Sequence, residues 1–242
     1  GGGGGAVGGW EADRLGDDRA RRPTLGIVDG RLAELAWPEF VIRLIRRSGR
    51  DLLVLTGPEP DYRWPSLAAA VVEAARALGV GEWISLGAIP AAVPHTRPVP
   101  IIGTSSRPGL LRGDVLAGPT GLLRVPAALV SVLEMAAAAA GIPAVGYFAQ
   151  VPHYVSGPYP AAALALHRAV ARHLDLDLPI GPLGDESDQL RERLDLATTA
   201  DESTRGYVER LEAMVDEQRL PEGDDLISEI EKFLRDQGSQ RN

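Results

Sequence analysis

Apolar residues along this chain are grouped into blocks that predict strands and helices in alternation. Four continuous apolar runs have the pattern of strands that are covered on both faces. They lie at residues 51–57, 82–90, 99–106 and 142–150. Helical spacing of apolar residues predicts helices over 65–78, 126–140 and 159–174. This alternation indicates an α/β fold with a mostly parallel sheet and helices on both of its faces.

Two segments before residue 50 have patterns of their own. In TLGIVDG, Thr24–Gly30, an Asp-Gly pair separates two apolar runs, which predicts a β-hairpin. Within Trp37–Arg47, the apolar residues Phe40, Leu44 and Ile45 fall at helical spacing. We expect a short helix there, with a strand as the alternative.

The chain changes character after Gly184. Apolar residues recur at helical spacing at Tyr207, Leu211 and Met214, with Val208 and Val215 alongside. A second stripe follows in 224–237 after the turn PEGD. We expect a helical hairpin whose apolar stripes are buried against the body of the protein, against the partner helix or against another chain. The predicted parts are a Gly-rich start (1–16) outside the fold, an α/β core domain (17–184) and an acidic helical appendage (185–242).

The charge of the chain is placed unevenly. Residues 184–242 hold 8 basic and 17 acidic residues, so the net charge of −8 resides in this last quarter. A near-neutral body with an acidic end lacks the clustered Lys and Arg of a nucleic-acid binder, so we expect no nucleic-acid partner. We also expect no membrane association, because no run reaches the roughly 18–20 apolar residues of a membrane span. The absence of cysteine and of a signal-peptide pattern fits a cytoplasmic protein without disulfides.

Polar residues that could take part in binding or catalysis lie in the loops that follow the predicted strands. In an open parallel sheet, ligands bind beyond the carboxyl ends of the strands, so four parallel strands would bring these loops together. The candidate ligand or partner residues are Glu59, Asp61, Arg63, Trp64, His95, Thr96, Arg97, Ser105, Ser106, Arg107, His153 and Tyr154.

Several catalytic classes lack their motifs. The chain contains no GxSxG elbow of a serine hydrolase, no GxxxxGK[ST] loop for phosphate transfer and no GxGxxG after a strand. It has no HExxH, and the six-residue spacing of His167 and His173 puts them on different helix faces, so we expect no metal site. We therefore assign no catalytic residue and no cofactor.

Each group of polar loop residues has a structural interpretation beside the functional one. Arg97 and Arg107, with the neighbouring serines, could bind a phosphate or carboxylate, or they could pair with Glu59 or Asp61 and stiffen the loops. These two carboxylates could be an acid–base pair, or part of a proline-braced turn. Gly118–Leu123 offers backbone N–H groups near a predicted helix start to an anion, or it is a plain turn.

Several sequence segments, taken together, resemble those of the bacterial branch of the proteasome assembly chaperone-like family. They include LLVLTGPEPDYRW, LGAIPAAVPHTRPVPIIGTSS, GPTGLL and IPAVGYFAQVPHYVSGPYP, and LPEGDDLISEIEKFLRD resembles the tail of actinobacterial members. The resemblance implies a three-layer α/β/α sandwich similar to nucleoside phosphorylases, frequent self-association and a role as a chaperone or assembly factor. It brings no catalytic residues, and the GWNDAG-like loop usual near the start of members is missing here.

Two functional hypotheses follow. The first is a non-catalytic protein-binding or assembly factor that forms a homo-oligomer, favoured by the missing catalytic motifs, the acidic hairpin and the resemblance. The alternative is a nucleoside-phosphorylase-like enzyme, or a binder of a small phosphate-linked ligand at the loops after the strands, which rests on fold analogy. Arg97, Arg107 and His153 discriminate between them. If these three residues point into one pocket, the small-ligand alternative is favoured. If they are held in ion pairs, or lie under the C-terminal helical hairpin, the assembly-factor hypothesis is favoured.

Overall fold

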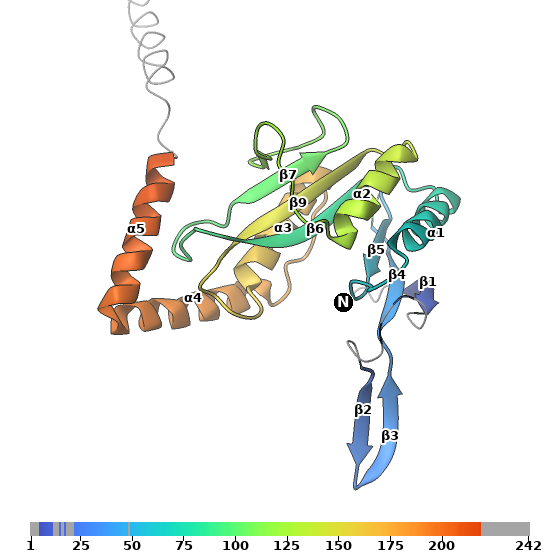
Figure 1. Cartoon of the computed structure of the whole chain (residues 1–242), viewed down its shortest axis with the longest axis horizontal. Coiled ribbons are helices and arrows are strands. Elements are labelled where there is room, and N and C mark those ends of the chain that lie inside the picture. Colours follow the sequence, from blue (N-terminus) through green and yellow to red (C-terminus); the bar gives the residue numbers. More distant parts are fainter. Residues whose placement is uncertain (1–4, 12–14, 16, 18–21, 48, 219–242) are drawn as a thin grey trace, which may run out of the picture. The chain divides into compact units, whose positions relative to one another are not determined.

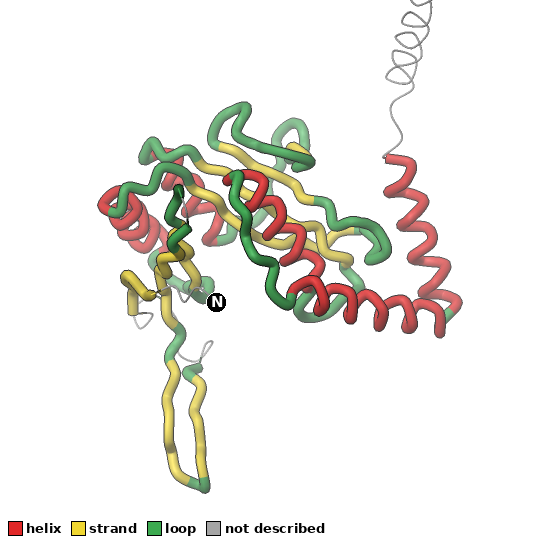
Figure 2. Tube along the Cα trace, turned by 180° about the vertical axis from the view of Figure 1, so that it is seen from behind, coloured by secondary structure: helices red, strands yellow, loops and turns green. Residues whose placement is uncertain are grey.

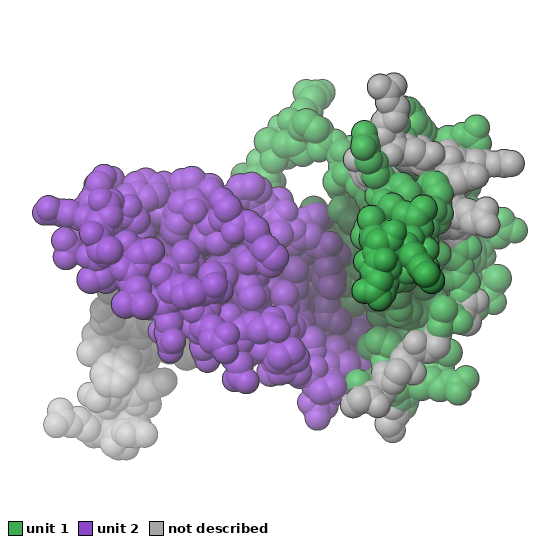
Figure 3. Space-filling model, turned by 90° about the horizontal axis from the view of Figure 1, so that it is seen from below, with its two compact units in different colours: residues 1–85, 104–111, 119–146 green, residues 86–103, 112–118, 147–242 purple. Residues whose placement is uncertain are grey.

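The computed structural model describes residues 5–11, 15, 17, 22–47 and 49–218, which form nine strands and five helices. The chain divides into two compact units that are interleaved along the sequence (Figure 3). Unit 1 comprises residues 1–85, 104–111 and 119–146, and unit 2 comprises residues 86–103, 112–118 and 147–242. The mixture of strands and helices confirms the α/β class.

Unit 1 contains an antiparallel sheet with the strand order β1-β4-β5. Its strands are β1 (Gly5–Glu11), β4 (Glu39–Ile45) and β5 (Leu52–Thr56). The short helix expected over 37–47 is wrong, because this segment forms β4 and buries Phe40 and Ile42 on one face. Pairing on both sides satisfies the backbone of β4 in the extended form, which the spacing of a few apolar residues cannot reveal. The Gly-rich start, which the sequence places outside the fold, provides β1.

The predicted hairpin is confirmed as β2 (Thr24–Val28) and β3 (Arg31–Ala36), which pair only with each other among the described strands (Figure 1). Asp29 and Gly30 have φ angles of 49° and 75°. A two-residue type I′ turn requires such left-handed values at both positions, and Asp-Gly tolerates them. The turn residues therefore determine where the chain reverses.

Two helices of unit 1, α1 (Trp64–Ala77) and α2 (Leu129–Ala139), lie against each other. Pro65 lies in the first turn of α1 as predicted, and the helix ends before Gly79, whose φ is 69°. The apolar faces of both helices meet in one core. Its buried residues include Phe40, Leu67, Val71, Leu129 and Leu133.

The second sheet has the strand order β6-β9-β7-β8. Its strands are β6 (Trp83–Ala91), β7 (Ile101–Ser105), β8 (Leu116–Ala117) and β9 (Ala144–Pro152), three of which confirm predicted runs. β7 is parallel to β8. Backbone hydrogen bonds join Ser106 to Ala144 and Gln150 to Pro100, so β7 is antiparallel to β9. The sheet is therefore mixed, because the antiparallel pair of β7 and β9 interrupts the parallel arrangement that the sequence predicts.

Unit 2 contains three consecutive helices, α3 (Pro160–Leu174), α4 (Leu183–Ala200) and α5 (Glu202–Gln218) (Figure 2). The predictions of α3 and of the first helix of the C-terminal hairpin, which is α5, are confirmed. The sequence does not predict α4. This helix buries no residue, so its segment shows no apolar stripe. The second predicted hairpin helix, 224–237, lies outside the described residues. No helix in the described part of the chain is long and apolar enough to cross a bilayer.

Candidate functional site

The predicted candidate residues fall into two groups, one in each compact unit. The idea of a single cluster required four parallel strands, but β5 belongs to another sheet and β7 is antiparallel to β9. Unit 1 contains Glu59, Asp61, Arg63, Trp64, Ser105, Ser106 and Arg107, and unit 2 contains His95, Thr96, Arg97, His153 and Tyr154.

In unit 1, the two candidate carboxylates accept hydrogen bonds from the backbone. Glu59 Oε1 accepts from the N–H of Leu129, the first residue of α2, at 2.7 Å. The first N–H groups of a helix have no partner within the helix, so Glu59 stabilises the start of α2. Asp61 Oδ2 accepts from the N–H of Asp17 at 2.8 Å. Both contacts support the structural interpretation of this loop.

The next two candidates shape the start of α1. Arg63 precedes the helix in the left-handed conformation, with a φ of 59°. The indole N–H of Trp64 donates to the carbonyl of Pro60 at 2.6 Å, and its ring packs against the core of unit 1. Trp64 therefore braces the loop that precedes α1.

The loop after β7 is attached to β9. Ser106 donates its backbone N–H to the carbonyl of Ala144 at 2.9 Å, and its Oγ accepts from the N–H of the same residue at 3.0 Å. Ser105 and Arg107 are exposed. No hydrogen bond or ion pair joins Arg107 to another described residue, so it does not pair with Glu59 or Asp61.

The segment Gly118–Leu123 does not open a helix. α2 begins only at Leu129, and its first N–H is already bound by Glu59. The N–H of Gly118 donates to the carbonyl of Gly103 at 3.0 Å. The plain-turn interpretation of this segment is therefore the better supported one.

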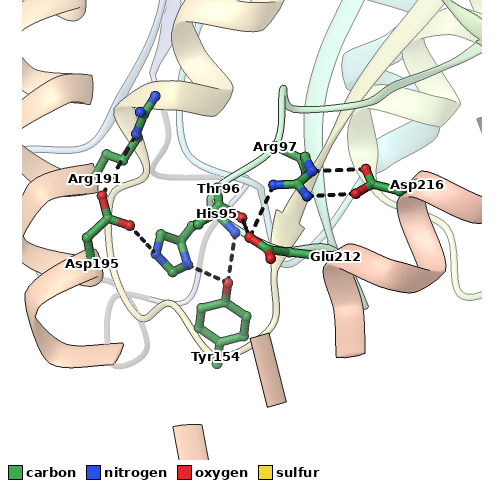
Figure 4. Close-up of polar contacts among 8 residues, drawn as sticks. All are labelled: His95, Thr96, Arg97, Tyr154, Arg191, Asp195, Glu212 and Asp216. Atoms are coloured by element: carbon green, nitrogen blue, oxygen red, sulfur yellow. Dashed lines mark hydrogen bonds and ion pairs between the residues drawn. The ribbon is translucent and has the colours of Figure 1, made fainter. Parts of the chain in front are cut away.

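In unit 2, candidate loop residues meet side chains from the last two helices (Figure 4). We name this group the loop–helix cluster. It consists of His95, Thr96 and Arg97 from the loop after β6, Tyr154 from the loop after β9, Asp195 from α4, and Glu212 and Asp216 from α5. Sequence reasoning missed the three carboxylates, because they lie about 100 residues or more from their partners.

Arg97 is bound by two carboxylates of α5. Its Nε and Nη2 donate to the two oxygens of Asp216 at 2.9 and 2.6 Å, and its Nη1 donates to Glu212 Oε1 at 3.1 Å. Thr96 Oγ1 also donates to Glu212. The hydrogen bond to Asp216, with the charges of both carboxylates, raises the pKa of Arg97 above its usual value. Since an arginine is charged at neutral pH in any case, the two carboxylates fix the position of the guanidinium rather than its charge.

His95 is held in one orientation by neighbours on both ring nitrogens. Its side chain is 1% exposed, and its Nε2 lies 3.2 Å from Asp195 Oδ1. The Tyr154 hydroxyl accepts from the backbone N–H of His95 at 2.8 Å and lies 2.7 Å from Nδ1. The carboxylate of Asp195 can only accept, so the hydrogen between them lies on Nε2, and in the neutral ring Nδ1 then accepts a hydrogen bond from the Tyr154 hydroxyl.

Tyr154 keeps the proton that this arrangement requires. Burial raises the pKa of its hydroxyl, and the nearby Tyr207, Glu212 and Asp195 act in the same direction, against the hydrogen bond from His95. The phenol therefore remains a donor at neutral pH. Such a network orients His95, but it leaves neither of its ring nitrogens open to a ligand.

His153 is bound from two sides as well. Its Nδ1 lies 3.1 Å from the carbonyl of Ala91, which only an N–H can satisfy, and its Nε2 then accepts from the Tyr207 hydroxyl of α5 at 2.9 Å. The rings of His153, Tyr154 and Tyr207 contact one another edge to face. α5 thus contacts both candidate loops of unit 2.

The apolar stripe predicted for α5 is covered within the chain. Val208, Leu211 and Val215 are buried, whereas Met214 is exposed. All of the predicted residues except Tyr207 and Met214 are therefore buried, and the polar contacts of Tyr207, Glu212 and Asp216 flank them. Val208, Leu211 and Val215 are buried within this chain, and the polar contacts beside them join α5 to the loops after β6 and β9.

No group of His, Asp and Glu in the part of the chain that the structure describes has the arrangement of a metal site. His173 is fully buried beside Tyr147. Its ring belongs to the interior of unit 2. The titratable groups of the loop–helix cluster bind one another, and the cluster can position loops and helices.

A carboxyl outside the cluster should make stability depend on pH. Burial raises the pKa of Glu134 in α2, against hydrogen bonds from Thr104 and Ser85. The folded state therefore favours the protonated carboxyl, and its contribution to stability is lost as the pH rises through the raised pKa. We expect Glu134→Gln to be more stable than the parent at neutral pH, because the amide oxygen still accepts from Thr104.

The same reasoning gives the control for this prediction. Below the ordinary pKa of 4.5, the parent carboxyl is neutral in both states, so the two proteins should have equal unfolding free energies. Glu73→Gln, an exposed substitution in α1, should show no such pH-dependent gain. Urea unfolding of the three proteins across this pH range measures the effect, and a Glu134→Gln gain that is the same at every pH would contradict it.

Comparison with known proteins places this geometry in a family. The sequence profile of the PAC2 family matches residues 6–197. A PAC2 family protein from Streptomyces avermitilis is 34% identical, with a TM-score of 0.76 over 85% of this chain and 87% of the other. The Mycobacterium tuberculosis proteasome-assembly chaperone homologue Rv2125 is 32% identical, with a TM-score of 0.76 over 84% of this chain and 86% of the other.

A third structure agrees with these two. The Mycobacterium tuberculosis protein of unknown function Rv2714 is 33% identical, with a TM-score of 0.80 over 88% of this chain and 73% of the other. No curated protein matches the chain significantly. The profile match covers most of the chain and ends before α5, and the matched structures share its fold at about one third identity, so the chain belongs to the PAC2 family.

Proposed function

We propose that this protein is a non-catalytic protein-binding or assembly factor. The observation that supports it is the state of Arg97, the strongest candidate for an anion site. Its guanidinium is bound by Glu212 and Asp216 of the same chain. His95 and His153 are likewise engaged by Asp195 and Tyr207.

These contacts weigh against a phosphate-linked ligand at the loops of unit 2. A planar guanidinium binds a carboxylate and a phosphate through the same paired N–H groups. The Asp216 carboxylate occupies that pair, and its attachment to the same chain gives it a high effective concentration. A free anion would have to displace the Asp216 carboxylate to take this pair of N–H groups.

The relatives support the same proposal. One of the structures about one third identical to this chain is described as a proteasome-assembly chaperone homologue. An assembly factor needs a stable surface for another protein and no reactive group. We propose a protein partner for this chain on that basis, together with self-association.

The proposed division of the chain into a core domain and an acidic appendage fits this role. We propose residues 17–184 as a core domain of nucleoside-phosphorylase-like α/β/α type and residues 185–242 as an acidic helical appendage. Such an appendage, with 8 basic and 17 acidic residues between 184 and 242, favours a partner with a basic surface. We propose a cytoplasmic location, with which the lack of cysteine agrees.

The proposal is tested by two binding experiments on the full chain. The first is capture of partners from a lysate of the source organism, in which we expect one protein to be retained in a stoichiometric amount. The second is calorimetric titration with inorganic phosphate and with nucleosides, in which we expect no saturable binding.

Two arginine variants make the titration decisive. Arg97→Gln removes the candidate anion ligand, and Arg107→Gln removes an exposed arginine that has no described partner. Saturable phosphate or nucleoside binding by the parent and by Arg107→Gln, but not by Arg97→Gln, would contradict the proposal and favour the small-ligand alternative.

A further inference from the structure

α5 is separated from α4 by a break in the helical backbone at a single residue (Figure 1). This residue, Asp201, is extended, with φ and ψ angles of −125° and 118°. Its side chain accepts hydrogen bonds from the N–H and the hydroxyl of Thr204, at 2.7 and 2.6 Å, so α5 begins on a cap of its own. Because the break is confined to one residue, α5 can move as a unit while α4 stays helical.

The helices on the two sides of this break are held differently. α4 lies beside α3 but buries no residue. α5 buries Val208, Leu211 and Val215, and its polar groups bind the loops after β6 and β9. Gly206 lies inside α5, where a glycine lowers the intrinsic stability of a helix. The position of α5 therefore depends on its side-chain contacts rather than on a rigid connection to α4.

The contacts of α5 match the chemistry of the two loops. The guanidinium of Arg97 binds the carboxylates of Glu212 and Asp216 (Figure 4). Nε2 of His153 accepts from the hydroxyl of Tyr207. The two carboxylates are four residues apart, so they lie on one side of the helix, beside its buried aliphatic residues. An aliphatic stripe with a charged edge is the pattern by which a protein surface recognises an amphipathic helix.

The polar part of this contact is open enough to be exchanged. The side chains of Arg97, Glu212 and Asp216 are 30%, 25% and 50% exposed. Ion pairs with this exposure contribute little to stability, because water competes for both partners. The region matched by the family profile, residues 6–197, contains both loops and ends before α5. The loops therefore belong to the matched fold, and the helix that binds them follows it.

We propose that the loops after β6 and β9 form a docking surface for an acidic amphipathic helix of a partner protein. In the free chain α5 occupies this surface, and the partner helix binds by displacing α5. The loop segments 91–100 and 152–159 contain Arg97 and two histidines but no acidic residue, so their charge selects an acidic helix. This inference rests on the proposed protein-binding function, and it specifies the surface and the kind of partner.

The contacts of α5 also specify the pattern of the partner helix. Counted from Tyr207 as position 1, the buried aliphatic residues occupy positions 2, 5 and 9, and the two carboxylates that bind Arg97 occupy positions 6 and 10. A tethered helix has an effective concentration of about a millimolar. A free helix of equal affinity therefore binds weakly until α5 is loosened.

The test uses a fluorescent synthetic peptide with the sequence of residues 201–218, because this peptide carries the pattern. Its binding to the full chain is measured by fluorescence anisotropy. Leu211→Ala in the chain removes a buried side chain of α5 and raises the share of chains whose docking surface is open. We expect the peptide to bind this variant at least about 10-fold more tightly than the parent. Met214→Ala, at a half-exposed position of the same helix, should bind the peptide like the parent.

Two further substitutions in the Leu211→Ala chain test the surface itself. Arg97→Gln should weaken peptide binding at least about 10-fold, because it removes the partner of both carboxylates. Arg107→Gln, at an exposed arginine of unit 1, should leave peptide binding unchanged. A peptide with Glu212→Gln and Asp216→Asn should bind the Leu211→Ala chain about as weakly as the native peptide binds its Arg97→Gln form.

A second loosened chain keeps the test valid if Leu211→Ala does not fold, which far-ultraviolet circular dichroism shows. Glu212→Gln with Asp216→Asn in the chain weakens the hold of α5 through its charges and leaves Leu211 in place. We expect the native peptide to bind this chain more tightly than it binds the parent, again in a way that depends on Arg97.

The outcomes separate this inference from the proposed function. Equal peptide binding by the parent, Met214→Ala and the loosened chains would overturn the inference, as would binding that Arg97→Gln does not change. An oligomer of the full chain that Arg97→Gln dissociates would assign the surface to α5 of a second copy, against the assignment to a partner. Neither result contradicts the proposed protein-binding function, which fails if phosphate or a nucleoside binds saturably to the parent at Arg97.

Discussion

Replacing Tyr147 with alanine is expected to lower the free energy of unfolding by about 3–5 kcal/mol, as for other aromatic residues removed from a core. Tyr147 of β9 is fully buried, and its hydroxyl is hydrogen-bonded to Nδ1 of His173, which is also fully buried in the last turn of α3. The substitution leaves both a cavity and an altered environment for a buried ring nitrogen. Urea unfolding of the parent and the variant measures the loss.

Two further variants show which part of Tyr147 matters. Tyr147→Phe keeps the ring and removes only the hydroxyl, so we expect a smaller loss of about 1–3 kcal/mol. Tyr62→Ala, at a side chain that is largely exposed, should change stability by less than about 0.5 kcal/mol. If Tyr147→Ala were no more destabilising than Tyr62→Ala, the buried contact between Tyr147 and His173 would be contradicted.

Leu211→Ala is expected to weaken the attachment of α5 by about 2–5 kcal/mol, the usual cost of removing a buried leucine side chain. Leu211 is buried between Val208 and Val215 on the same face of the helix. Its removal leaves the polar contacts of Glu212 and Asp216 with Arg97, which are partly exposed and therefore contribute less than the apolar core of the contact. Amide exchange over 202–218 should become at least about 20-fold faster.

The matched control for this prediction is Met214→Ala, which lies on the same helix but is half exposed. It should change the exchange of α5 little, by less than about 0.5 kcal/mol in free energy. Tryptic cleavage after the exposed Arg205 and Arg210 gives a second readout, since a protease cuts a helix only after it unfolds locally. Equal exchange and cleavage in the two variants would mean that the helix is held by its polar contacts alone.

Release of α5 would also expose the groups that it binds. Arg97 and the Nε2 of His153 lose their partners when Glu212, Asp216 and Tyr207 move away. The Leu211→Ala variant therefore offers a way to ask whether the loops have a latent affinity for anions. Under the proposed function, phosphate and nucleosides should still fail to bind this variant.

Local pattern was sufficient for most of the individual elements. Continuous apolar runs located β5, β6, β7 and β9, and the Asp-Gly pair located the turn between β2 and β3. Helical spacing located α1, α3 and α5. These features follow from interactions between residues close in the chain, such as turn conformation and the periodic exposure of one face.

The predicted residues of the site were partly informative. The segments His95–Arg97 and His153–Tyr154 do lie in one cluster of unit 2, although they are far apart in the chain. The acidic pair Glu212 and Asp216, four residues apart beside the buried Leu211 and Val215, was a visible signal for a partner of Arg97. Nothing in local periodicity, however, says which arginine such a pair binds.

The sequence by itself determined the α/β class, most element positions, the hairpin turn and the acidic end of the chain, because each depends on composition or on neighbours along the chain. Only the tertiary structure decided that 39–45 is a strand, that β7 is antiparallel to β9 and that α4 exists. It also decided that the partners of Arg97 come from α5, 115 and 119 residues away. These outcomes depend on backbone pairing and side-chain contacts between distant segments, which no local pattern specifies.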